Sequence, residues 1–165
     1  MASTVLTDRL VKHIDEAIAM EQTVLRMLDS MIQTTDDDRI KESFRLHKLE
    51  TERHIDRLTK RLEAHDASPS LIREAGGIAG ALMKGVVDVV RSEKAARNAR
   101  DAYATEHLEI AAYQLLERVA QRAGDEETAE VARLNRKDEE SMAKTIDANW
   151  DHFVELALRE AGVKV

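Results

Sequence analysis

Residues 106–127 read EHLEIAAYQLLERVAQRAGDEE and contain most of one helix, a turn and the start of another helix. Apolar residues recur every three or four positions, as on one face of an amphipathic α-helix. Gly124 is the residue type that ends helices, and Asp125 is a preferred helix N-cap. We therefore predict helices over 93–123 and 126–161, folded back on each other. Their inward residues should be Tyr103, Ile110, Tyr113, Leu116, and Val131, Leu134, Met142, Ile146, Phe153, Leu156.

The N-terminal part of the chain has the same arrangement. Apolar residues at helical spacing predict helices over 4–34 and 39–64, and the segment 34–38, TTDDD, favours a turn and a new N-cap. Two antiparallel hairpins of long helices make a four-helix bundle. The inward residues expected here are Leu10, Ile14, Ile18, Leu25, Leu28, Ile32, and Ile40, Phe44, Leu58, Leu62.

A glycine-rich segment joins the two hairpins. Ser68 and Pro69 favour the N-cap and the first position of a helix, so we predict an additional, shorter connecting helix. Residues 76–90, GGIAGALMKGVVDVV, carry glycines that allow close backbone approach, and a packing or dimer contact is our interpretation. Lys84 and Asp88 interrupt this apolar stretch, which is too short to span a bilayer.

Composition narrows the function classes. The 165 residues suit one domain, 1–165, and with 35% charged and 3% aromatic residues they favour an all-α protein. A net charge of −7 argues against a nucleic-acid partner, and the absence of cysteine excludes thiolate metal sites and disulfides. The N-terminus lacks the pattern of a signal peptide, so we expect a cytoplasmic protein with no membrane partner.

Each long helix carries acidic residues near its middle, where apolar residues would be expected. They are Glu21; Glu50, between His47 and His54; Glu106 and Glu109; and Asp138, Glu139 and Glu140. Buried carboxylates need compensating cations, and oxygen and imidazole ligands suit iron, manganese or zinc. The sequence therefore predicts a carboxylate and histidine metal site at mid-bundle.

The heights of these acids along the helices support that interpretation. If the first turn centres near Asp36, Glu21 and Glu50 each lie about 15 residues from it, or roughly 22 Å along the axis. The same reflection about Gly124 sets Glu109 opposite residues 139–140. Two alternatives stay open: His47 and His54 compete for one ligand role, and arginines could pair with the acids instead.

Several of these stretches resemble the YciF-type bacterial stress proteins, a family of the ferritin-like superfamily. The resemblance is carried by EHLEIAAYQLLERVAQRAGDEE together with AMEQTVLRML, HKLETERHIDRL and DEES, so it covers most of the chain. It implies a ferritin-like antiparallel four-helix bundle with an extra connecting helix, a homodimer, a di-metal site and a role in stress. The implied metal ligands are Glu21, Glu50, His54, Glu106, Glu109, and Glu139 or Glu140.

The chain departs from the stricter ferritin-like pattern, because neither 39–64 nor 126–161 contains a Glu-x-x-His motif. We expect two metal ions, iron or manganese or zinc, reacting with oxygen or peroxide as in a ferroxidase or a peroxide-reducing protein. The alternative is a non-catalytic structural or interaction protein, in which arginines neutralise the acids and the glycine-rich helix mediates assembly. Iron storage in a hollow shell is a third, weaker hypothesis.

Overall fold

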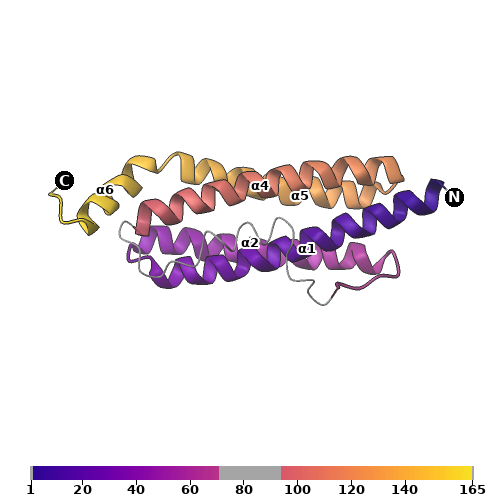
Figure 1. Cartoon of the computed structure of the whole chain (residues 1–165), viewed down its shortest axis with the longest axis horizontal. Coiled ribbons are helices and arrows are strands. Elements are labelled where there is room, and N and C mark those ends of the chain that lie inside the picture. The colour runs from indigo at the N-terminus through magenta and orange to yellow at the C-terminus, as the bar shows by residue number, and fades with distance from the viewer. Residues whose placement is uncertain (1, 71–93, 165) are drawn as a thin grey trace.

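The computed structural model describes residues 2–70 and 94–164. Within these ranges the secondary structure is entirely helical, and the helices are α1 (Ala2–Thr34), α2 (Asp38–Glu63), α4 (Lys94–Ala123), α5 (Glu126–Asp147) and α6 (Trp150–Glu160). Figure 1 shows the hairpins α1–α2 and α4–α5 lying side by side along the long axis, with α6 at one end. The predicted all-α, ferritin-like antiparallel four-helix bundle is confirmed.

The helices α2 and α4 run in the same direction along the bundle (Figure 1). The predicted connecting helix lies almost entirely outside the described residues. One detail of that prediction is wrong: Pro69 is not the first residue of a helix, since residues 67–70 are not helical. Instead, the N–H and hydroxyl of Ser70 both donate to the Asp15 carboxylate, at 2.9 and 2.5 Å.

The two tight turns form as their residue types predict. Asp37 caps α2 by accepting a hydrogen bond from the N–H of Ile40 at 2.9 Å. Gly124 ends α4 with a φ of 77°, a conformation that costs glycine little, and Asp125 caps α5 through the N–H of Thr128 at 2.9 Å. These caps fix both hairpins and the register of the helices in them.

The predicted helix over 126–161 is broken in two, which corrects the sequence interpretation. It ends at Asp147 and starts again at Trp150 as α6. Asn149 lies at the break, where its side-chain amide donates to the carbonyl of Thr145 at 2.7 Å and accepts from Arg39 at 3.1 Å. Asparagine competes in this way with helical backbone bonds, so the chain bends and α6 crosses the end of the bundle.

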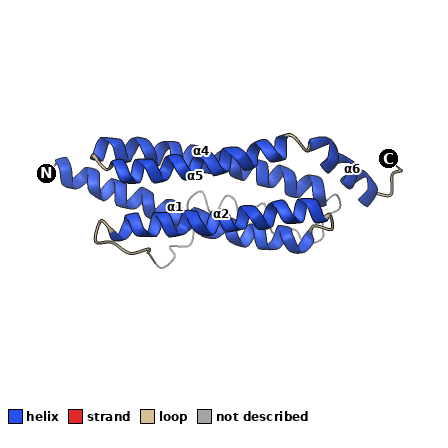
Figure 2. Cartoon of the chain, turned by 180° about the vertical axis from the view of Figure 1, so that it is seen from behind, coloured by secondary structure: helices blue, strands red, loops and turns tan. Residues whose placement is uncertain are grey.

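The bundle core consists of two apolar clusters. One surrounds Leu10, Ile14 and Leu58, and the other surrounds Leu28 and Phe44. Between these clusters the inward positions of the helices are polar, which places a buried polar layer at mid-bundle. Figure 2 shows from behind that the long helices run through the middle of the bundle without interruption.

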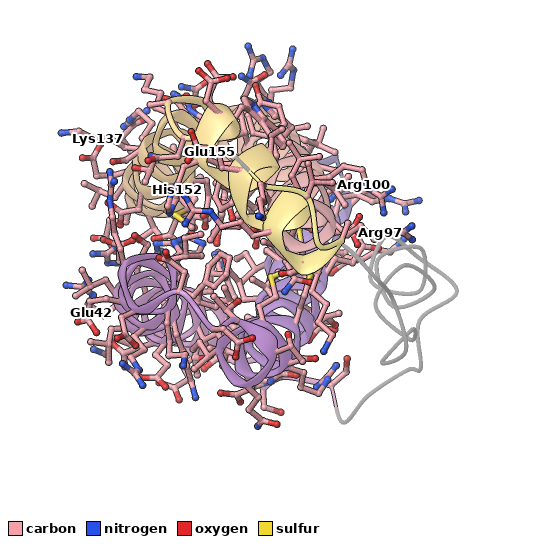
Figure 3. The ribbon with its side chains drawn as sticks, turned by 90° about the vertical axis from the view of Figure 1, so that its left-hand side faces the viewer. Glu42, Arg97, Arg100, Lys137, His152 and Glu155 are labelled. Atoms are coloured by element: carbon pink, nitrogen blue, oxygen red, sulfur yellow. The ribbon has the colours of Figure 1, made fainter. Side chains whose placement is uncertain are left out.

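Two expected core residues of α5 lie elsewhere. Leu134 is 44% exposed and Val131 is only partly buried, whereas Ala132 and Asn135 are fully buried. Small residues here let α5 approach its neighbours closely, so the apolar pattern alone pointed to the wrong face. Charged side chains such as Glu42, Arg100 and Lys137 point outward in the end-on view of Figure 3.

Among the described helices, none is both long enough and apolar enough to cross a membrane.

Candidate metal centre

The polar layer at mid-bundle is built from six side chains, each at most 1% exposed. They come from all four long helices and are Glu21 on α1, His47 and His54 on α2, Glu106 and Glu109 on α4, and Glu139 on α5. Each follows the inward stripe of its helix, so burial of the neighbouring apolar residues carries these polar groups into the core. The helices thus enclose four carboxylates and two imidazoles.

One half of the layer gathers around His47. Its Nε2 lies 3.3 Å from Oε1 of Glu106 and 3.4 Å from Oε2 of Glu139. Glu109 completes this half, and each of the four residues offers a ligand atom within 4.8 Å of the others. Three carboxylates and one imidazole are a suitable ligand set for a divalent transition metal.

The other half of the layer gathers around His54. Its Nδ1 lies 3.3 Å from Oε1 of Glu21 and 2.9 Å from Oε1 of Glu139. Glu21, His54 and Glu139 likewise bring ligand atoms within 4.8 Å of one another. Glu139 therefore belongs to both halves, with one carboxylate oxygen directed to each histidine.

Each histidine also contacts a carboxylate on its outer side. Nδ1 of His47 lies 3.2 Å from Glu50, and Nε2 of His54 lies 3.1 Å from Asp138. These carboxylates are 34% and 32% exposed, so they lie between the layer and solvent. A carboxylate on the far nitrogen of a metal-binding histidine fixes the tautomer and the orientation of the ring.

A chain of hydrogen bonds supports Glu21 from the opposite side. The buried hydroxyl of Tyr113 donates to Oε1 of Glu21 and accepts from the amide of Asn135 at 3.0 Å. Asn135 in turn accepts from Arg57 at 2.9 Å. The sequence predicted Tyr113 as an inward residue, but it did not indicate Asn135 or Arg57. The signal for Asn135 was a polar residue one turn before Glu139.

The buried acids strongly perturb one another. Burial raises the pKa of Glu109 well above its ordinary value, and the charges of Glu139, Glu21 and Glu106 raise it further. Burial raises the pKa of Glu139 to about 7, although its close contact with His54 opposes that rise. The pKa of Glu21 is raised mainly by burial too. Without a cation, the layer must therefore hold protons near neutral pH.

The two histidines shift in the direction that favours a positive charge. Burial lowers the pKa of His54, but contacts with Glu139 and Glu21 outweigh burial and bring that pKa to about 10. Burial also lowers the pKa of His47, but contacts with Glu106, Glu50 and Glu139 outweigh burial. The pKa of His47 is therefore well above its ordinary value. Protonated imidazoles are the cations that the chain itself can supply to the layer.

Those two imidazoles do not satisfy the layer. Both oxygens of Glu109 and both oxygens of Glu139 lack a well-formed hydrogen bond, as do Oε2 of Glu21, Oε2 of Glu106 and the inner nitrogens of both histidines. Within residues 2–70 and 94–164, no lysine or arginine pairs with these four carboxylates. Unpartnered buried polar atoms are rare in proteins, and here they converge. The donor set fits bound metal ions.

The structure brings together five of the seven residues that the sequence suggested as ligands. It also places His47 in the layer together with His54, although the sequence had set these two histidines in competition for one ligand role. Glu50 lies at the edge of the layer against His47, and Glu140 is 42% exposed and pairs with Arg136. The physical reason is helical phase, since one residue corresponds to about 100° of rotation. Glu139 is on the centre of the buried stripe of α5, so Glu140 points away from it.

The chain matches the family described as "Domain of unknown function (DUF892)" over residues 5–159. A protein of Xanthomonas campestris pv. campestris has a similar structure, with a TM-score of 0.78 and 26% identity, and covers 96% of this chain and 99% of its own. The Escherichia coli stress protein YciF matches with a TM-score of 0.74 and 18% identity, over 96% of this chain and 98% of its own. The bacterioferritin of Desulfovibrio desulfuricans, which has a diiron site, matches with a TM-score of 0.77 and 16% identity, over 97% of this chain and 89% of its own. The chain therefore belongs to the DUF892 family, and its fold is that of the ferritin-like helical bundles.

Proposed function

We propose that this protein binds two metal ions, iron or manganese, in the layer between its four long helices. The observation that supports this most is the set of four buried carboxylates that no lysine or arginine neutralises in the described part of the chain. Two divalent ions would balance four carboxylate charges with both imidazoles neutral. Hard carboxylate oxygens and imidazole nitrogens suit iron and manganese, while zinc remains an outcome of the test.

The six buried side chains divide into two ligand sets. His47, Glu106 and Glu109 would hold one ion, and Glu21 and His54 would hold the other. Glu139 would serve both, because its two oxygens face different histidines. Glu50 and Asp138 would orient the imidazoles from outside, and Glu140 would take no part.

The proposed reaction class is oxidation of the bound metal by oxygen or peroxide. Two ferrous ions together supply two electrons, which with two protons reduce hydrogen peroxide to two water molecules. The ferritin-like fold and the resemblance to a stress protein support this class. The residues of this chain would hold the pair in a layer whose six side chains are at most 1% exposed, between two apolar clusters.

The competing function is a non-catalytic structural role with the inner acids paired to arginine. Its expected ion pairs do not form among the described residues, where arginines such as Arg136 pair with outer acids instead. We further propose that the protein acts in the cytoplasm as a homodimer. Size-exclusion chromatography with light scattering measures that assembly and separates a dimer from the shell that iron storage would need.

Metal analysis of protein purified without chelators tests the proposed function. We expect about two ions per chain after addition of Fe(II) or Mn(II) without air, and about one ion per chain in Glu109→Gln. Glu140→Gln is the matched control, because it makes the same chemical change outside the layer and should leave metal content unchanged. If the unaltered protein takes up no Fe(II), Mn(II) or Zn(II), the proposal is wrong.

A further inference from the structure

A small cavity lies where α2, α5 and α6 meet at the end of the bundle. It has a volume of about 60 Å³ and opens partly to the surface. Buried apolar side chains form its inner wall, and these are Ile40, Phe44, Met142, Ile146 and Phe153. The cavity is therefore a place where a very small molecule can leave water for an apolar surface.

Polar contacts between α6 and the first hairpin surround this cavity. Asn149, which lines it, accepts a hydrogen bond from Arg39 at 3.1 Å, and His152 lies 3.1 Å from the carboxylate of Asp37. Figure 3 shows His152 on the side of α6 that faces the bundle. These contacts keep α6 over the end of the bundle and so maintain the wall to which Phe153 contributes.

Two residues of the inner wall lie about one helical turn from residues of the buried polar layer. Phe44 precedes His47 by three residues on the buried face of α2, and Met142 follows Glu139 by three on the buried face of α5. Three residues of helix correspond to about 4.5 Å along the axis. Phe44 and Met142 thus line the cavity about one helical turn from His47 and Glu139, and the methionine side chain is flexible.

Size and polarity restrict what can use this route. A water molecule takes up about 30 Å³ in the liquid, so the cavity accepts molecules of two or three heavy atoms. A polar molecule such as hydrogen peroxide would lose its hydrogen bonds on passing Phe44 and Met142, whereas dioxygen has none to lose. The apolar wall therefore favours dioxygen.

We propose that this cavity is the route by which dioxygen reaches the metal centre, and that peroxide does not depend on it. This inference rests on the proposed function. In the reaction served, two Fe(II) ions each lose one electron, and dioxygen gains two electrons and two protons to become hydrogen peroxide. The cavity's contribution is to deliver dioxygen next to His47 and Glu139 without opening the polar layer to bulk water.

Filling the cavity tests the proposal. Ser43 and Thr145 line it from opposite helices, so Ser43→Phe and Thr145→Phe should each occupy its volume. Ser141→Phe is the matched control, because Ser141 is exposed one turn before Thr145 and does not line the cavity. We expect each filled variant to keep its metal content and to oxidise Fe(II) several-fold more slowly with dioxygen, but at an unchanged rate with hydrogen peroxide.

Xenon supplies a readout that needs neither metal nor turnover. Crystals of metal-free protein pressurised with xenon should show an anomalous peak in the cavity, and crystals of a filled variant should lack it. Unchanged dioxygen rates in a variant that has lost the xenon peak would overturn the inference, as would equal slowing with peroxide. A wild-type protein that binds no metal would instead overturn the proposed function, and this inference with it, before any oxidant is added.

Discussion

Nδ1 of His54 lies 2.9 Å from Oε1 of Glu139, and both side chains are completely buried. Because the second oxygen of the same glutamate faces His47 at 3.4 Å, one residue of α5 connects the two halves of the polar layer. Glu139 contacts both histidines of α2, and none of the other buried carboxylates of the layer does so. This distinguishes its expected role from theirs.

Replacing Glu139 should therefore affect both metal positions. We expect Glu139→Gln to reduce metal content from about two ions per chain to fewer than one, whereas Glu106→Gln should remove about one ion. Metal analysis after anaerobic loading and dialysis measures both. Equal losses in the two variants would show that Glu139 does not serve both positions.

Metal binding should release protons and tighten as pH rises. Near pH 7 the metal-free protein holds a proton on His54, whose pKa is about 10, and on part of the Glu139 population, whose pKa is about 7. A metal ion must displace these protons, so the apparent affinity for Mn(II) should increase by about tenfold or more from pH 6 to pH 8. Titration calorimetry in buffers of different ionisation enthalpy counts the protons, and an affinity independent of pH would contradict the prediction.

The metal-free protein should lose stability over the same pH range. Glu139 has a higher pKa when folded than its ordinary 4.5, so its stabilising proton is present below about pH 4.5 and is lost as pH rises through 7. His54 acts in the same direction, with its contribution complete below its ordinary 6.5 and lost toward pH 10. The melting temperature without metal should fall from pH 5 to pH 9, and bound Mn(II) should flatten that dependence. Thermal unfolding followed by circular dichroism tests both.

The sequence was sufficient for the four long helices because their apolar residues keep the helical period over many turns. Capping residues such as Asp37 and Asp125 predicted the turns, because a helix cap depends only on residues close in the sequence. The break at Asn149 could not be predicted, because the apolar period continues from Ile146 to Phe153 without a change. It depends on a contact with Arg39, which is distant in the chain.

Candidate ligands were recognisable because a glutamate on an apolar stripe is out of place. The choice among neighbours was not, since Glu139 and Glu140 differ by one residue and only the packing of α5 decides which faces inward. Val131 and Leu134 suggested a rotation of α5 that its buried residue Ala132 contradicts. The hydrogen bond from Arg57 to Asn135 could not be predicted from the sequence, because it depends on α2 and α5 being adjacent.

Asp125 should contribute to stability far from the metal centre. Burial would raise its pKa, but bonds from Thr128, His65 and Arg61 outweigh burial and lower that pKa to about 2. Asp125→Ala should therefore cost about 2 kcal/mol at neutral pH, and wild-type stability should fall as pH decreases from about 4 to about 2. Urea unfolding measures the loss. Asp36→Ala, at an exposed position of the other turn, is the control and should cost little.

Tyr113 should tune one metal position without being a ligand. Its hydroxyl donates to Oε1 of Glu21, which leaves the unpartnered Oε2 free to face a metal ion. Tyr113→Phe removes this hydroxyl and frees Glu21 to turn. The affinity for the metal ion held by Glu21 and His54 should therefore weaken by about tenfold to a hundredfold, while the other ion stays bound. Tyr103→Phe is the control, because it also removes one tyrosine hydroxyl, here from a ring that contacts Trp150. It should leave both metal affinities unaltered. Calorimetric titration with Mn(II) resolves the two binding steps, and equal weakening of both steps in Tyr113→Phe would show that the tyrosine acts on the whole layer through packing and not on Glu21.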